Sequence, residues 1–152
     1  MIIPEYLYAQ IQQVMPIPCV DLLVSDAQGR VLLVKRKKEP AAGQWWFPGV
    51  RVHYLETRES AALRKLKEEC GLESTQMVEM GTYDVILDKP DDTNPRHGIT
   101  TLFRIAVNKQ RDFILDAQSS AAEWWCENLH PFVKEGKTTM KKRLDKKQRC
   151  QC

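Results

Sequence analysis

The sequence lacks several features that would assign it to a special class of protein. Its longest apolar stretches, such as residues 31–34, are too short to cross a bilayer, and the N-terminus has neither the basic segment nor the small-residue cleavage site of a secretory signal. It contains no internal repeat, low-complexity block or linker. With 152 residues, 43% of them hydrophobic and 28% charged, the chain is expected to form a single cytoplasmic domain over residues 1–152 with no membrane partner.

The cysteines lack the arrangement of a disulfide framework or a zinc site. Their number, five, is odd, and the first three are widely spaced in apolar or helical segments. The last two lie in a polar tail without a nearby histidine. Reduced core thiols are therefore expected at the first three positions of the set Cys19, Cys70, Cys126, Cys150 and Cys152.

Charge is unevenly distributed along the chain. Residues 137–152 carry seven basic side chains and one aspartate, a net charge of +6, so the rest of the chain carries −3 of the total of +3. A basic tail can contact nucleic acid, but no aromatic residue is interleaved with these charges, as single-strand binding would favour. We therefore expect a solvated C-terminal helix or tail and do not expect a nucleic-acid partner.

Apolar periodicity and turn residues predict an α+β fold, a sandwich built on a mixed sheet. A helix is expected within the N-terminal region 1–16, starting at Pro4. A second helix is expected from Thr57, its N-cap, to Cys70, with Gly71 as its C-cap. The expected strands are residues 19–24 and 30–36, which form a hairpin, then 45–47, 76–87, 99–107, 112–115 and 123–126, with helices from residue 131.

Side-chain direction is also predicted for two segments. In the second helix, Ala62, Leu63, Leu66 and Cys70 form the expected apolar stripe. The adjacent residues Trp124 and Trp125 should point to opposite faces of a strand, one into the core and one outward.

Residues 46–72 carry the pattern with the clearest chemical meaning. A turn at Pro48–Gly49 leads into a loop that ends at Glu56, and the following helix contains Arg64, Glu68 and Glu69. Arg64 and Glu68 are spaced for an ion pair, and Glu56 can fold back beside them. Three converging carboxylates favour a hard cation such as Mg²⁺ or Mn²⁺, which also binds diphosphates. An ordinary charged helix face is the alternative reading of the helix alone.

The segment resembles the Nudix box, G-x5-E-x7-R-E-U-x-E-E-x-G-U, where U is a bulky aliphatic residue. Two positions depart from it: Val50 stands where the box begins with glycine, and Lys65 stands where glutamate follows the arginine. The resemblance implies a Nudix-type α/β/α sandwich with its loop–helix and a divalent metal cofactor. The matching positions are Glu56, Arg64, Leu66, Glu68, Glu69, Gly71 and Leu72.

The flanking sequence is similar to the GDP-mannose mannosyl hydrolases, a branch that also lacks the glutamate after the arginine. The shared features are an N-terminal helix, an LL-x-KR strand that ends at Arg36, a P-A-x-G-x-W loop over residues 40–45, a W-F-x-P-G-x-R-V turn that is one residue shorter here, and the pair Thr100–Thr101. This resemblance implies attack of water on the anomeric carbon of the sugar, which releases GDP and mannose. It also implies a homodimer, with the N-terminal helix region at the interface.

Site residues follow from the resemblance by position. Arg36 and Arg51 would hold the diphosphate of a nucleotide sugar, and Arg64 would support the helix carboxylates. His53 and Trp45 are further candidates for substrate contact. The implied metal ligands are the backbone carbonyl of Val50 and the side chains of Glu56, Glu68, Glu69 and Gln118.

The general base is left open. The branch places a histidine where this chain has Ser119, and a serine hydroxyl is a poor base. His97 and Glu123 are the alternatives, although a lone loop histidine is more often a solvated surface residue. Val50 raises a further question, because a β-branched residue resists the positive φ that a glycine in a turn often adopts.

Three functions remain as hypotheses. The first is a Mg²⁺-dependent hydrolase that converts GDP-mannose into GDP and mannose. The second is a pyrophosphohydrolase that attacks phosphorus in a nucleotide sugar or nucleoside triphosphate, which the presence of both Glu68 and Glu69 favours. The third is a Nudix-fold nucleotide-binding protein without turnover, which Val50, Lys65 and Ser119 favour.

Overall fold

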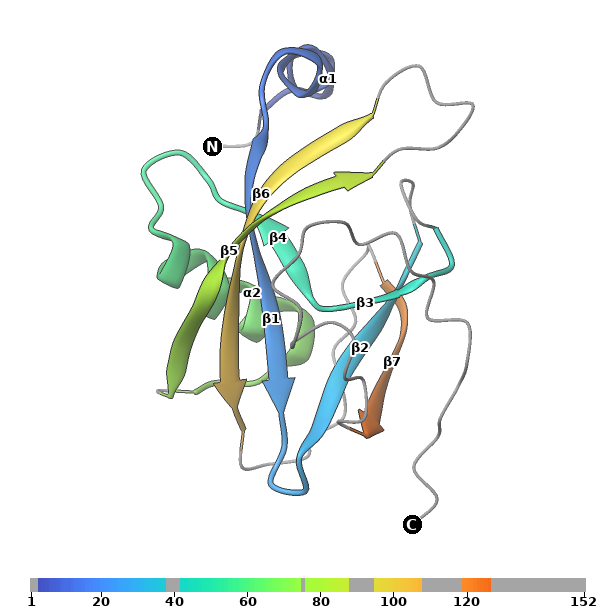
Figure 1. Ribbon diagram of the computed structural model, residues 1–152, viewed down its shortest axis with the longest axis vertical. Coiled ribbons are helices and arrows are strands. Elements are labelled where there is room, and N and C mark those ends of the chain that lie inside the picture. The colour runs from blue at the N-terminus through green and yellow to red at the C-terminus, as the bar shows by residue number, and fades with distance from the viewer. Residues whose placement is uncertain (1–2, 38–41, 75, 88–94, 108–118, 127–152) are drawn as a thin grey trace.

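The computed structural model describes residues 3–37, 42–74, 76–87, 95–107 and 119–126. In these residues one mixed sheet is flanked by helix α2, and helix α1 lies at one end of it (Figure 1). The elements are α1 (Glu5–Val14), β1 (Ile17–Ser25), β2 (Arg30–Arg36), β3 (Trp45–Trp46), β4 (Gly49–Arg51), α2 (Arg58–Cys70), β5 (Met77–Leu87), β6 (Arg96–Ala106) and β7 (Ser119–Cys126). This arrangement confirms the predicted α+β fold.

The central strand β1 has different neighbours along its length. It runs parallel to β6 from Ile17 to Ser25 and antiparallel to β4 from Cys19 to Asp21. Its recorded pairing with β2 joins Ser25 to Val31, beside the turn, whereas β2 pairs along its whole length with β7. The predicted hairpin is therefore confirmed at its turn, but its two strands diverge above it (Figure 1). The space between them receives the chain that enters β4.

The hairpin turn is fixed by local hydrogen bonds. The Asp26 carboxylate accepts from the backbone N–H groups of Gln28 and Arg30, both at 2.9 Å, and forms an ion pair with the Arg30 guanidinium at 2.7 Å. Gly29 supplies the positive φ of 74° that the turn requires. These are short-range interactions, which explains why the turn is readable in the sequence.

Alternate residues of β1 enter two different hydrophobic clusters. Val20, Leu22 and Val24 are fully buried and pack with the residues of α2 that face the sheet. Leu23 points to the other side, into a cluster with Phe47 and Trp125. Both faces of β1 are therefore covered, as its nearly continuous apolar sequence suggests.

Helix α2 begins and ends where the sequence predicts. The Thr57 hydroxyl accepts a hydrogen bond from Ser60 N–H, and Gly71 takes a left-handed conformation with φ of 62°. The predicted apolar stripe is wrong at Leu63, which is 42% exposed. Lys65 is instead buried between the core residues of the helix, with 4% exposure. The helix is thus turned so that Arg64 and Glu68 meet the preceding loop, and Leu63 faces outward.

Helix α1 lies on the end of the sheet and buries none of its residues. The Arg51 guanidinium stacks over the Tyr8 ring at 4.3 Å, and Arg96 donates a hydrogen bond to Gln12. Tyr6 and Val14 are 71% and 82% exposed. A helix of 10 residues is marginal in isolation, so these few contacts to the sheet orient it.

Other predictions have mixed outcomes. Strands are confirmed near every expected position that lies in the described part of the chain, and β4 is an additional strand. Trp124 and Trp125 point to opposite faces as expected, but neither faces outward: Trp125 is buried in one cluster, and Trp124 packs against the α2-side cluster with Arg30 5.9 Å from its ring. Cys70 is buried and Cys19 partly buried, and neither forms a disulfide.

Some expectations fall outside the described residues. They are the strand at 112–115, the helices from residue 131 and the basic tail 137–152. Within the described residues, no helix is long and apolar enough to cross a membrane.

Candidate functional site

Strand β4 connects two groups of charged residues. Gly49 and Arg51 pair with Asp21 and Cys19 of β1, whereas Val50 pairs with Val20 and packs against the α2-side core. Val50 lies in an ordinary strand, because the one non-glycine residue with positive φ in the described ranges is Leu55. Val50 therefore does not adopt the positive φ that a glycine in a turn often takes. The sequence reading missed β4 because Pro48–Gly49 resembles a simple turn.

The first group, the Glu56 group, consists of Glu56, Arg64 and Glu68. Arg64 donates from Nε to Glu56 Oε1 at 2.7 Å and from Nη2 to Oε2 at 2.9 Å, so both carboxylate oxygens are engaged. Its Nη1 reaches Glu68 Oε2 at 3.3 Å and its Nη2 reaches the Arg51 carbonyl at 3.4 Å. The hydrogen bonds from Arg64 lower the pKa of Glu56 to about 2.

The backbone of the loop supports the same carboxylate. His53 N–H donates to Glu56 Oε2 at 2.9 Å, and the His53 ring lies 3.9 Å from that oxygen. Glu56 N–H donates back to the His53 carbonyl at 3.2 Å and closes a turn around Tyr54 and Leu55. Leu55 takes φ of 62° and is 88% exposed, so the turn places a residue with a side chain in a conformation that suits glycine.

Two of the three carboxylates that were expected to converge, Glu56 and Glu68, do so around a guanidinium. Glu56 and Glu68 both contact Arg64, which offsets the repulsion that the sequence reading assigned to a cation. No cluster of three or more metal-binding side chains occurs in the described part of the chain. The Glu69 side chain and Gln118 are not described. The described residues therefore do not make up a metal centre by themselves.

The second group, the Asp21 group, consists of Asp21, Arg36, Trp46 and Lys65. Asp21 is 8% exposed in the middle of β1, and burial raises the pKa of its carboxyl to about 7. Arg36, a hydrogen bond from the Trp46 side chain and Lys65 act in the opposite direction on the same pKa. Gly49 touches this carboxylate so closely that a Cβ there would overlap with Asp21 Oδ1.

Sequence reasoning did not identify Asp21 as a site residue. The available signal was a single carboxylate within the apolar run of residues 19–24, where a buried charge requires partners. Those partners come from β2, β3 and α2, so no local pattern identifies them.

The two predicted diphosphate-binding arginines lie near the same part of β1. Burial and Asp21 raise the pKa of the Cys19 thiol to about 12, whereas Arg51 and Arg36 lower it. Both guanidiniums are thus close enough to Cys19 to act on one thiol. That thiol stays protonated near neutral pH and is unsuited to act as a nucleophile.

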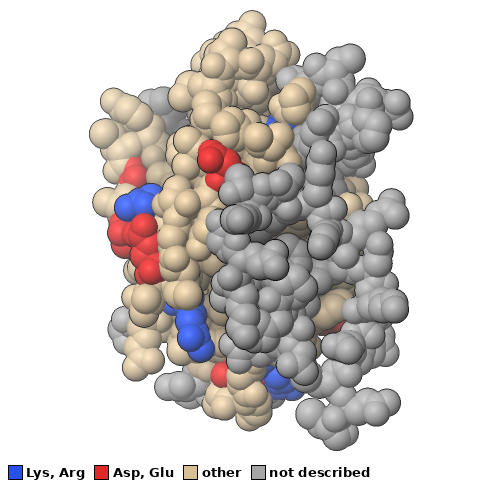
Figure 2. All heavy atoms as spheres, in the orientation of Figure 1, with Lys and Arg blue, Asp and Glu red and all other residues tan. Residues whose placement is uncertain are grey.

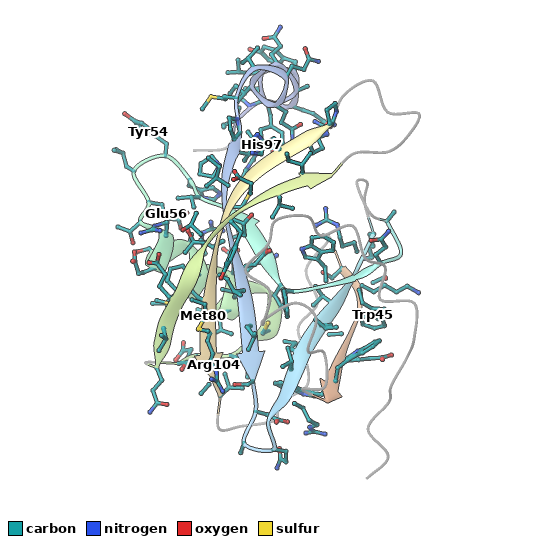
Figure 3. The ribbon with its side chains drawn as sticks, viewed as in Figure 1. Trp45, Tyr54, Glu56, Met80, His97 and Arg104 are labelled. Atoms are coloured by element: carbon teal, nitrogen blue, oxygen red, sulfur yellow. The ribbon has the colours of Figure 1, made fainter. Side chains whose placement is uncertain are left out.

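The remaining predicted residues are spread over the sheet. His97 is 39% exposed by side chain and contacts Asp84 Oδ1 at 3.1 Å. It precedes Leu102, the strand partner of Asp21, by five residues, which is about 16 Å along a strand. Glu123 lies on β7, opposite Leu33. In Figure 3, His97 lies below α1, Glu56 beside the loop and Trp45 across the sheet.

The two tryptophans of β3 have different partners. Trp45 packs against Trp125 with ring centroids 5.6 Å apart, whereas Trp46 belongs to the Asp21 group. Ser119 is buried opposite Arg36 at the start of β7. The structure thus brings together Glu56, Arg64 and Glu68 at the loop and places Arg36 and Arg51 where both influence Cys19, while His97 contacts Asp84 and Glu123 lies opposite Leu33.

A mixed sheet with a loop and helix joined through a glutamate–arginine pair defines the class of protein. The family model described as NUDIX domain matches residues 15–145. The chain is 32% identical over 136 residues to the low-salt glycan biosynthesis protein Agl8 of Haloferax volcanii, covering 86% of each chain. The chain therefore belongs to the Nudix family.

Further relatives have different descriptions. The chain is 34% identical over 92 residues to an ADP-ribose pyrophosphatase of Methanocaldococcus jannaschii, which covers 60% of this chain and 52% of that protein. A crystal structure of a MutT NUDIX hydrolase from Burkholderia pseudomallei superimposes with a TM-score of 0.61 at 26% identity, covering 72% of this chain and 82% of that one. These comparisons establish the family and fold, and leave the branch within the family to be proposed.

Proposed function

We propose that the protein hydrolyses a nucleoside diphosphate linked to a second group, most simply a sugar, by attack of water on phosphorus. The observation that carries this proposal is the placement of Arg36 and Arg51 near one buried part of β1, where two guanidiniums can bind a diphosphate. Similarity to a pyrophosphatase supports attack on phosphorus, the second hypothesis of the sequence analysis, over release of free sugar.

The residues of the site take the following proposed roles. Arg36 and Arg51 hold the diphosphate, with His53 and Trp45 as further substrate contacts. Arg64 positions Glu56 and through it the loop. His97 or Glu123 is the proposed general base. Neither residue belongs to the Glu56 group or the Asp21 group.

A divalent cation, Mg²⁺ or Mn²⁺, is part of the proposal. Its proposed ligands are the Val50 carbonyl and the side chains of Glu56, Glu68, Glu69 and Gln118. Bound there, a cation would stabilise negative charge on the diphosphate. Removal of the cation with EDTA should abolish turnover, and restoration by excess Mg²⁺ would separate this effect from unfolding.

Release of free sugar is the second candidate. This chain has Lys65 in place of the box glutamate, and the mannosyl hydrolase branch also lacks that glutamate. The Haloferax relative is described as a glycan biosynthesis protein. GDP-mannose would then yield GDP and mannose by attack on carbon.

Product analysis tests both candidates. The purified protein is incubated with Mg²⁺ and GDP-mannose or ADP-ribose, and products are identified by mass spectrometry. A nucleoside monophosphate with a sugar phosphate supports attack on phosphorus, whereas GDP with free mannose supports attack on carbon and overturns the first candidate. Binding without turnover would instead support the third hypothesis, a nucleotide-binding protein.

Matched variants test the arginines. Arg36→Gln and Arg51→Gln should each lower kcat/KM by about 100-fold, because each removes a charged donor to the diphosphate. Arg104, which is exposed on β6, provides the control, and Arg104→Gln should leave kcat/KM unchanged. Equal activities in all three variants would contradict the proposed roles.

We also propose a homodimer that covers α1. The helix buries none of its residues, and Tyr6, Val14 and Met15 are exposed, as are Ile86 of β5 and Ile99 of β6. Figure 2 shows few charged side chains over this end of the molecule. Light scattering should give twice the chain mass for the wild type and the chain mass for Val14→Asp. A monomeric wild type would refute the dimer.

A further inference from the structure

The side chain of Arg51 reaches from β4 to helix α1. Its guanidinium carbon lies over the Tyr8 ring, 4.3 Å from the ring centre. Cation–π attraction acts within about 6 Å of the ring centre, so this contact is a close one. Arg30 and Trp124, by comparison, are separated by 5.9 Å. An arginine that the proposed function places on the diphosphate is therefore held by an aromatic residue of the N-terminal helix.

One face of α1 points to the sheet. Tyr8, Ile11 and Gln12 share this face at helical spacing and are half-buried, whereas Tyr6 is exposed. Gln12 accepts a hydrogen bond from Arg96 of β6. Tyr8 and Gln12 are thus the residues through which α1 contacts two basic side chains of the sheet.

Both contacts are made on the face of the sheet opposite α2. Arg51 pairs with Cys19, and Cys19 pairs with Thr100 of β6, so these three side chains share a face. Arg96 precedes Thr100 by four residues on the same strand and therefore points to that face as well. Val50, beside Arg51 in β4, packs against the α2-side cluster instead. Helix α1 thus covers the end of the face that carries Arg51, as its place in Figure 1 shows.

Stacking leaves the hydrogen-bonding groups of an arginine available. The N–H groups of a guanidinium lie in its plane, whereas an aromatic ring contacts its face. Arg51 can therefore remain over Tyr8 and donate hydrogen bonds to phosphate oxygens from its edge. Its backbone is held as well, because its carbonyl accepts from Arg64 Nη2 at 3.4 Å. A side chain that is already in place loses less conformational freedom when a ligand binds.

We propose that Tyr8 is a positioning residue that holds the Arg51 guanidinium in place for the diphosphate, which makes helix α1 part of the substrate site. This inference rests on the proposed function and deepens it. The aromatic ring performs this task, and the hydroxyl group does not take part in it. Another aromatic residue should therefore replace Tyr8, whereas an aliphatic residue should not.

Calorimetric titration with GDP in the presence of Mg²⁺ tests the role of the ring. Tyr8→Leu should weaken GDP binding by about 5- to 10-fold, because the cation–π attraction is lost. Tyr8→Phe keeps the ring and should bind within about twofold of the wild type. Tyr6→Leu, at an exposed tyrosine of the same helix, is the matched control and should also bind within about twofold. Equal affinities of the wild type and Tyr8→Leu would overturn the proposal.

A double variant separates the positioning of Arg51 from direct contact of Tyr8 with the ligand and from general support of the helix. In the Arg51→Gln background, Tyr8→Leu should have no further effect on GDP binding, because the group that it positions is gone. The same weakening in both backgrounds would show that Tyr8 acts without Arg51 and would also overturn the proposal.

Nuclear magnetic resonance observes the stack itself. The ring current of Tyr8 should displace the Arg51 Nε–H signal, which is assigned by its loss in Arg51→Gln, and Tyr8→Leu should return it toward the ordinary arginine position. In the wild type alone, contacts between the Tyr8 ring protons and the Arg51 Cδ protons should persist when GDP is added. Loss of these contacts on addition of GDP would overturn the proposal even if Tyr8→Leu did not fold.

The outcomes distinguish this proposal from the proposed function. GDP binding that depends on Tyr8 and Arg51, without hydrolysis of a nucleotide sugar, would refute the proposed hydrolysis alone. GDP binding that is weakened by Arg51→Gln but not by Tyr8→Leu would refute the role of Tyr8 alone. No GDP binding by the wild type would refute both.

Discussion

Asp21 and Glu56 lie at the two ends of residues 49–56, because Asp21 pairs with Gly49 and Glu56 ends the loop that follows β4. Their environments shift their pKa values in opposite directions. Glu56 accepts two hydrogen bonds from Arg64 and one from His53 N–H, and its pKa falls to about 2. Asp21 is enclosed within the sheet, and its pKa rises to about 7 although Arg36 and Lys65 are near. Positive neighbours alone therefore do not determine the charge of a carboxylate.

The comparison separates positioning from reactivity. Directed hydrogen bonds stabilise the charged form of Glu56 and fix the loop to α2. At Asp21 the loss of hydration outweighs the attraction of its neighbours, so the group changes its protonation state near neutral pH. The Glu56 group is thus suited to hold structure, and the Asp21 group is sensitive to any charge that binds beside it. Four experiments sharpen or break this distinction.

The largest effect is expected from Gly49→Ala. The added Cβ would overlap with Asp21 Oδ1 and lie 3.2 Å from the Val20 carbonyl, so both strands would have to move. We expect a loss of about 3 kcal/mol in the free energy of unfolding, measured by urea titration. Gly98→Ala is the control, because the nearest atoms to its Cβ lie at 3.6 Å, and it should change stability by less than about 0.5 kcal/mol. Equal stability of the two variants would refute the close contact.

Glu56→Gln should have the next largest effect. It removes the charged partner of Arg64 from a carboxylate whose side chain is 14% exposed, and should lower the free energy of unfolding by about 2 kcal/mol at pH 7. Glu68→Gln, at the 58% exposed partner of the same arginine, should cost less than about 1 kcal/mol.

The pH dependence provides a check on Glu56. Its pKa is lower in the folded protein than its ordinary value of 4.5, so its contribution is present above that value and is lost as pH falls toward 2. The difference between wild type and Glu56→Gln should therefore shrink over this range. A constant difference would indicate that the ion pair does not set the pKa.

Asp21→Asn should have an effect of comparable size that appears at the opposite end of the pH scale. The pKa of Asp21 is higher in the folded than in the unfolded protein, so ionisation destabilises the fold as pH rises from 3.8 through 7. Relative to the wild type, Asp21→Asn should gain a few kcal/mol between pH 4 and pH 8, because each unit of pKa difference corresponds to about 1.4 kcal/mol. Urea titrations at several pH values measure this gain. A relative loss over this range would mean that Asp21 is charged throughout.

The smallest effect, and a stabilising one, is expected from Leu55→Gly. Leu55 is 88% exposed and has a left-handed conformation, which costs roughly 1 kcal/mol for a residue with a side chain. Glycine removes this strain, although its flexible unfolded state offsets part of the gain, so the thermal midpoint should rise slightly. Tyr54→Gly, at the 78% exposed neighbour with ordinary φ, should lower it. A lower midpoint in both variants would argue against strain in the loop.

The parts of the molecule that sequence reasoning predicted are those fixed by short-range interactions. Helix α2 is bounded by the Thr57 cap and by Gly71, both readable from residue type and spacing. The pair between Glu56 and Arg64 joins residues eight positions apart, within one loop and two helical turns. The turn at Asp26 is similarly local. In each case the interacting residues are close in the sequence, so residue type and spacing are enough to predict the contact.

Long-range pairing explains what the sequence did not reveal. The segment Gly49–Arg51 is a strand because β1 separates from β2 and leaves an edge for it to pair with, which no property of Pro48–Gly49 indicates. Asp21 meets Trp46 and Lys65 only after the sheet and α2 have assembled. Helical spacing includes Leu63 in the apolar stripe, but in the structure Arg64 contacts the loop and Leu63 faces outward. The base and the ligands at Glu69 and Gln118 stay predictions.

Strand β4 is three residues long, and its alternation limits how the chain can vary in length. Adding or removing one residue within it would turn Arg51 into the apolar core and bring a valine to Asp21. A change before Pro48 leaves this parity intact, and the turn here is already one residue shorter than the related pattern. A substrate loop grafted onto this protein should therefore be joined before Pro48, with the number of residues from Gly49 to Glu56 unchanged.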